Sequence, residues 1–88
     1  MAADNRPSIS ELRSELLERF GPLMNGPALR QALGFRTAGA FRQAMSRDDS
    51  GLPAFQIPGR RGWYALSHDV AAWLLNQANA AHREDRAR

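Results

Sequence analysis

The apolar positions of the chain first recur at helical spacing near its start. Ser8 and Glu11 have the spacing of a capping box, in which a hydroxyl and a carboxylate each bind a free amide of the first helical turn. The stripe that follows consists of Ile9, Leu12, Leu16, Leu17 and Phe20. Glutamates and arginines fill the opposite side, and Gly21-Pro22 ends the pattern. The pattern predicts an amphipathic helix over residues 8–20.

Two shorter helical patterns follow, separated by a tight turn. Pro27 suits the first position of a helix that ends at Gly34, and Thr37 is a good N-cap for the next helix. The inner face of that second helix would carry Ala40, Phe41, Ala44 and Met45. Its outer side and its start would carry Arg36, Gly39, Arg42, Gln43 and Arg47. The result is a helix-turn-helix pattern.

Alternating apolar residues then predict a β-hairpin over residues 54–66. Strands are expected at 54–57 and 63–66, and the turn-forming segment 58–62 places Arg60 and Arg61 at the tip. Leu23-Met24 is an apolar pair that suits one strand-like rung. Ser67 caps a final helix, whose buried stripe contains Val70, Trp73 and Leu74. A hairpin in this position is the wing of a helix-turn-helix domain.

These elements divide the chain into four parts. Residues 1–7 are expected to be a disordered N-terminus, 8–20 an amphipathic helix, 23–78 the winged domain and 79–88 a polar, disordered tail of mixed charge. With 88 residues the chain forms one domain with a small core. The predicted fold class is therefore mainly α with a small β-hairpin, a winged helix-turn-helix.

Charge indicates the class of partner. All twelve basic residues are arginine, the side chain that binds phosphates and guanine edges in bidentate fashion. Residues 26–68 hold six arginines against two aspartates, a surplus of +4 where the whole chain carries +3. The surplus lies around the helix-turn-helix and the hairpin tip, and this placement favours nucleic acid as the partner.

Several other classes are disfavoured. The chain has no cysteine, and its two histidines stand apart, so we expect no metal and no cofactor. His68 and Asp69 are neighbours on a helix and do not face each other, which argues against an enzyme with a small-molecule substrate. No apolar run reaches the roughly 18 residues of a membrane span, and no secretory signal opens the sequence. We therefore expect a cytoplasmic protein without a membrane partner.

The segment GLPAFQIPGRRGWYALSHDVAAWL resembles the winged helix-turn-helix domains of excisionases, AlpA proteins and MerR-like regulators. In that group a Gly-x-Pro lead-in precedes a paired basic turn and a helix of the form Ser-x-Asp-Val/Leu-x-x-Trp-Leu. The matching residues are Gly51, Pro53, Arg60, Arg61, Ser67, Asp69, Val70, Trp73 and Leu74. Upstream, LRQALGFRTAGAFRQAM is similar to the group's helix-turn-helix, with residues 38–46 as the recognition helix. The resemblance covers residues 23–77.

The resemblance implies a sequence-specific binder of double-stranded DNA that acts as a transcriptional regulator or an excisionase-like recombination factor of a phage, plasmid or integrative element. Arg42 and Gln43 suit guanine and adenine edges, and Arg36, Thr37 and Arg47 suit backbone phosphate. Gly39 would leave room for close approach to DNA. Arg60 and Arg61 would follow the minor groove or the backbone. The long dimerising helix of MerR regulators has no counterpart, which favours an excisionase-like or AlpA-like factor.

Three alternatives stay open. The helix over 8–20 packs either on its own domain or against a second subunit, forming a homodimer. Trp63, Tyr64 and Trp73 serve either the core, which this small chain favours, or the stacking of bases, and Tyr64 is expected to be the most exposed of them. Finally, a winged scaffold also suits a protein-interaction adaptor that does not bind DNA.

Overall fold

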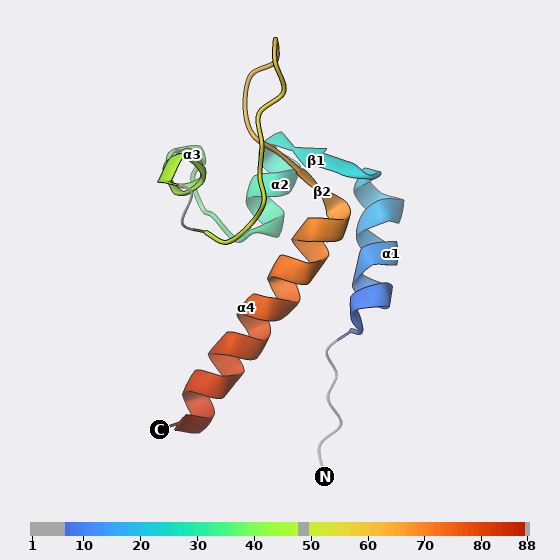
Figure 1. Ribbon diagram of the computed structural model, residues 1–88, viewed down its shortest axis with the longest axis vertical. Helices are drawn as coiled ribbons and strands as arrows, with labels where there is room; N and C mark the ends of the chain where they lie inside the picture. The colour runs from blue at the N-terminus through green and yellow to red at the C-terminus, as the bar shows by residue number, and fades with distance from the viewer. Residues whose placement is uncertain (1–6, 48–49, 88) are drawn as a thin grey trace.

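The computed structural model describes residues 7–47 and 50–87, and for residues 82–87 it describes the backbone alone. Helices dominate, and the strands form a two-stranded antiparallel sheet, which confirms the predicted fold class (Figure 1). The elements are α1 (Ile9–Phe20), β1 (Leu23–Asn25), α2 (Gly26–Ala32), α3 (Ala38–Arg47), β2 (Tyr64–Leu66) and α4 (Ser67–Ala87). The expected disorder of residues 1–7 falls almost wholly outside the described residues.

The small sheet differs from the predicted hairpin. β2 pairs with β1, in a register that sets Leu23 opposite Leu66 and Asn25 opposite Tyr64. The segment 54–57 is not a strand, because only Phe55 pairs with Tyr64, through two backbone hydrogen bonds of 2.8 Å. Prolines at positions 53 and 58 flank this segment and remove backbone donors, so its ladder cannot extend. The wing is therefore a loop closed by a single bridge.

Helix α1 packs on α4 of its own chain, and the two lie side by side in Figure 1. The capping box is present, with the Ser8 amide donating to Glu11 Oε1 at 2.8 Å and the Glu11 amide donating to Ser8 Oγ at 3.1 Å. Leu16 is buried, and Ile9 and Leu12 pack against the core. Most apolar side chains of α1 thus pack within the chain, as expected if this helix packs on its own domain and not against a second subunit.

Ser67 fastens the start of α4 to the end of α1. The residue is fully buried; its hydroxyl donates to the Gly21 carbonyl at 2.6 Å, and its amide donates to the Pro22 carbonyl at 2.8 Å. These bonds join two chain segments far apart in the sequence at the point where β1 and β2 pair. The N-terminal helix is therefore an integral part of the domain.

The prediction that residues 79–88 are disordered is wrong for those of them that the structure describes. α4 stays helical to Ala87, so residues 79–87 continue the helix (Figure 1). This segment, NAAHREDRA, is rich in alanine and arginine and contains no glycine or proline, so helix propensity outweighs its polarity. No helix in the described part of the chain is long and apolar enough to cross a membrane.

The aromatic side chains follow a different order of burial from the one predicted. Tyr64 is only 6% exposed, because it lies on β2 between the core and the stacked ring of Phe55. Trp63 and Trp73 are partly buried and pack against the core. The core interpretation of the three aromatics is thus supported, whereas the expectation that Tyr64 is the most exposed is wrong. Ala40, expected on the inner face of α3, is exposed.

Candidate nucleic-acid interface

Helix α3 is held by its buried face and by a cap at its start. Phe41 and Met45 are buried in the core, which turns the opposite side of the helix to solvent. Thr37 is the predicted N-cap, since its Oγ1 accepts a hydrogen bond of 3.0 Å from the Ala40 amide. The predicted contact residues are all exposed, namely Arg36, Thr37, Gly39, Arg42, Gln43 and Arg47. Their exposure is what a recognition helix requires.

The turn between α2 and α3 is fastened by Arg30, a role that the sequence analysis missed. Its Nη1 donates to the carbonyl oxygens of Phe35 and Arg36, at 2.9 and 3.0 Å. The ring of Phe35 also meets that of Phe41 edge to face, with ring centroids 5.9 Å apart. Arg30 therefore sets the direction in which α3 leaves the turn. Sequence spacing carries no signal for this bond, because an arginine reaches many carbonyls within a few residues.

The wing carries its arginines just after a tight turn. The Arg60 amide donates to the Ile57 carbonyl at 3.0 Å, and Gly59 between them has φ of 82°, a value that favours glycine. Arg60 and Arg61 are both exposed, as predicted. At the base of the wing, Trp73 Nε1 donates to the Ser50 carbonyl at 2.8 Å. This bond and the Phe55–Tyr64 bridge anchor both arms of the loop.

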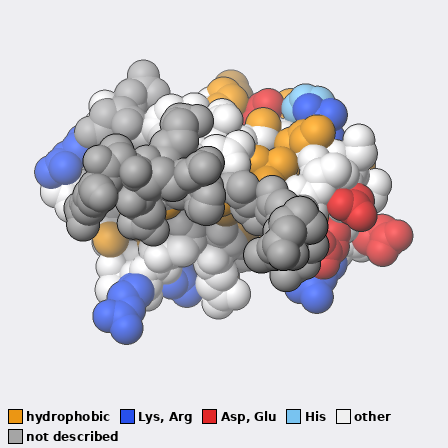
Figure 2. All heavy atoms as spheres, turned by 90° about the horizontal axis from the view of Figure 1, so that it is seen from below, with side chains coloured by type: hydrophobic (Ala, Val, Ile, Leu, Met, Phe, Trp, Pro, Cys, Tyr) orange, Lys and Arg blue, Asp and Glu red, His pale blue; other side chains and the backbone are white. Residues whose placement is uncertain are grey.

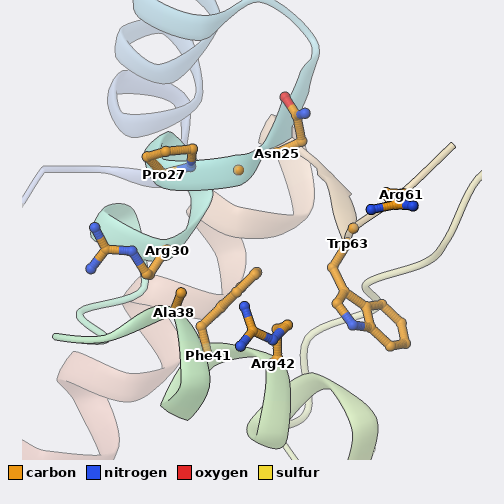
Figure 3. Close-up of a pocket in the computed structure, with 10 residues that line it drawn as sticks. Asn25, Pro27, Arg30, Ala38, Phe41, Arg42, Arg61 and Trp63 are labelled. Carbon is orange, nitrogen blue, oxygen red and sulfur yellow. The ribbon is translucent and has the colours of Figure 1, made fainter.

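One pocket brings α3 and the wing together. It has a volume of about 230 Å³ and opens between α2, α3 and the loop that follows the wing turn (Figure 3). Its lining residues are Asn25, Gly26, Pro27, Arg30, Ala38, Phe41, Arg42, Arg61, Gly62 and Trp63. Of the predicted site residues, Arg42 and Arg61 line this pocket. The other predicted residues lie outside the pocket, on α3, in the turn before it and on the wing.

The charge of this region is one-sided. None of the residues that line the pocket is acidic, while three are arginine. Seen from the end of the molecule where the termini lie, acidic side chains gather on the side of α1 among further arginines, and the opposite side, toward α3, shows arginine without acidic side chains (Figure 2). The glutamates on that side come from α1, at positions 11, 15 and 18, and all are exposed. In this view the side toward α3 therefore carries arginine alone, whereas the side of α1 carries both kinds of charge.

Comparisons of the chain with protein families, with curated proteins and with solved structures find no match. The described residues also hold no group of three or more histidine and carboxylate side chains placed to bind a metal ion. The exposed arginines of α3 and the wing, with the pocket between them, are therefore the feature from which function is inferred.

Proposed function

We propose that this protein is a sequence-specific binder of double-stranded DNA, acting as a transcriptional regulator or an excisionase-like recombination factor of a mobile element. The observation that carries the proposal is that Arg42 from α3 and Arg61 from the wing line one pocket, and that none of its described lining residues is acidic. A surface on which two separate elements present cations to the same space suits a polyanion that contacts both at once. The cytoplasm, where such DNA is found, is the proposed compartment.

In the proposed complex, α3 enters the major groove and the wing follows the neighbouring backbone or minor groove. Arg42 and Gln43 are exposed on α3 and would contact base edges. Arg36, Thr37 and Arg47 would bind phosphates at the two ends of the helix. Gly39 has open space around the position of a Cβ atom, so nothing in the chain itself fills the room that close approach to DNA needs.

The experiment is a titration of the protein into labelled duplex DNA at several salt concentrations. Three to five of the arginines between residues 26 and 68 would neutralise phosphates, so the log-log slope of affinity against salt should be roughly −3 to −5. A protein that fails to bind any duplex at low salt would refute the proposal.

Variants then test the two elements separately. The double variant Arg60→Ala/Arg61→Ala should weaken binding to all duplexes alike, because wing contacts follow backbone and groove width. Arg42→Ala should instead relax the preference at one base pair, by about 1–3 kcal/mol. Arg19→Ala is the matched control for Arg42→Ala, since each removes one exposed arginine, and it removes half the charge that the wing variant removes. A loss of affinity in the control equal to that of the wing variant would contradict the proposed orientation.

A protein-interaction adaptor is the second candidate, and the surface of α1 favours it. Leu17 and Phe20 remain 46% and 38% exposed, although the rest of the stripe is packed. These two side chains are also the ones through which a homodimer would form. The salt titration separates the two candidate functions, because an adaptor that uses α1 alone has no affinity for duplex DNA. A homodimer formed through α1 would leave α3 and the wing free and would still bind duplex DNA.

A further inference from the structure

The pocket between α2, α3 and the wing has walls of two kinds. Pro27, Phe41 and Trp63 supply apolar surface, and Ala38 adds a small side chain at its edge. Arg42 from α3 and Arg61 from the wing side supply positive charge (Figure 3). An occupant that suits both kinds of wall has an apolar body and an anionic group.

The arginines of this pocket are not equivalent. Arg30 already donates to two backbone carbonyls, so its guanidinium is occupied in holding the turn. Within the described residues, the side chains of Arg42 and Arg61 make no hydrogen bond or ion pair. Two guanidiniums without partners beside apolar surface form a site for an anion, since arginine binds phosphate through parallel N–H donors.

The size of the pocket restricts the occupant further. About 230 Å³ lies below the roughly 300–1,000 Å³ of pockets that enclose drug-sized ligands. A bare inorganic ion would leave the apolar walls unused. A single sugar–phosphate unit suits both kinds of wall, because it combines one anionic group with the C–H surface of a five-membered ring.

We propose that this pocket seats one sugar–phosphate unit of a bound DNA strand, with the phosphate between Arg42 and Arg61 and the sugar against Trp63 and Pro27. This proposal rests on the proposed function and makes it more specific. It assigns Trp63 a contact with the DNA backbone in addition to its packing on the core. A backbone unit held between α3 and the wing would fix the position of the recognition helix along the groove.

The two tryptophans provide a direct test by NMR, because each gives one indole N–H signal. Trp63 lines the pocket, whereas the Trp73 indole is bonded to the Ser50 carbonyl away from it and serves as an internal control. Addition of duplex DNA should shift the Trp63 signal and leave the Trp73 signal in place. Binding of duplex without movement of the Trp63 signal would overturn the pocket proposal while leaving DNA binding intact.

A second arm distinguishes the DNA strand from a free nucleotide. Thymidine monophosphate offers the same sugar and phosphate without a duplex. If it moves the Trp63 signal while duplex DNA does not bind, the pocket takes free nucleotides, and the strand proposal and the proposed function both fail. If duplex shifts the signal at micromolar concentration and the nucleotide requires millimolar concentration, the strand is the occupant.

A pair of variants tests whether filling the pocket weakens DNA binding when no charge is removed. Ala38→Leu extends a side chain into the pocket and should weaken duplex binding about tenfold, the equivalent of one lost contact. Ala81→Leu adds the same side chain at an exposed position of α4, away from the pocket and from α3, and is the matched control. Equal affinities of the two variants would overturn the proposal, and thermal melting verifies that both remain folded.

Discussion

Replacing Arg30 with alanine tests the bond that directs the recognition helix. The substitution removes one charged donor that serves the carbonyls of Phe35 and Arg36. Hydrogen bonds to charged groups contribute about 1.5–3 kcal/mol when buried, but the Arg36 carbonyl end is exposed, so we expect a loss of about 1–2 kcal/mol in the free energy of unfolding. A domain of this size loses about 4–8 °C per kcal/mol, which gives a fall in melting temperature of about 5–15 °C.

Circular dichroism melting measures this fall, and two variants control it. Arg30→Lys retains a cation that can donate to one carbonyl, so it should recover part of the lost stability. Arg42→Ala removes an exposed arginine from α3, and its stability should stay within about 0.5 kcal/mol of the parent. If Arg30→Ala melts at the temperature of the parent protein, the bond does not hold the turn and the argument for the direction of α3 fails.

Three further substitutions have distinct expected outcomes. Trp73→Ala should destabilise the fold by about 2–4 kcal/mol, less than the loss of a fully buried tryptophan would, and Trp73→Phe should cost about 1 kcal/mol for the lost bond to Ser50. Denaturant unfolding measures both values, and a Trp73→Ala protein as stable as the parent would contradict the packing of this ring. Ser67→Ala should cost about 1–3 kcal/mol, because the Gly21 carbonyl loses its donor, and an unchanged unfolding midpoint would show that water replaces it. Gly39→Ala should raise stability by about 0.4–1 kcal/mol and weaken DNA binding; a variant with unchanged affinity would show that α3 does not approach DNA closely there.

Features with a local cause were predictable from the sequence. The capping box at Ser8 and Glu11, the N-cap at Thr37 and the turn before Arg60 each depend on residues three positions apart. Such bonds form within one helical turn or one β-turn, so the residue types at that spacing are enough to predict them. The exposure of the arginines on α3 also follows from helical periodicity once Phe41 and Met45 are placed in the core.

Features that join distant segments were not predictable. The pairing of β2 with β1 links residues some forty positions apart, and the sequence indicated only a nearer partner in segment 54–57. Helix α4 is longer than predicted, because residues 79–87 combine a mixed charge, which is typical of a disordered tail, with residues that favour a helix. The pocket shared by Arg42 and Arg61 depends on three elements at once. No spacing rule relates these two arginines, since their separation is set by tertiary packing.

The packing of α1 bears directly on the proposed interface. The Ser67 bonds to the Gly21 and Pro22 carbonyls hold the end of α1 against the start of α4, immediately after β2. β2 in turn carries Tyr64, whose bridge to Phe55 closes the wing. The base of the wing is thus held by a chain of contacts that begins at the N-terminal helix. The predicted winged domain begins at residue 23 and so omits α1, the helix at which this chain of contacts begins. The position of Arg61 at the pocket that Arg42 also lines therefore depends on a helix outside the predicted winged domain.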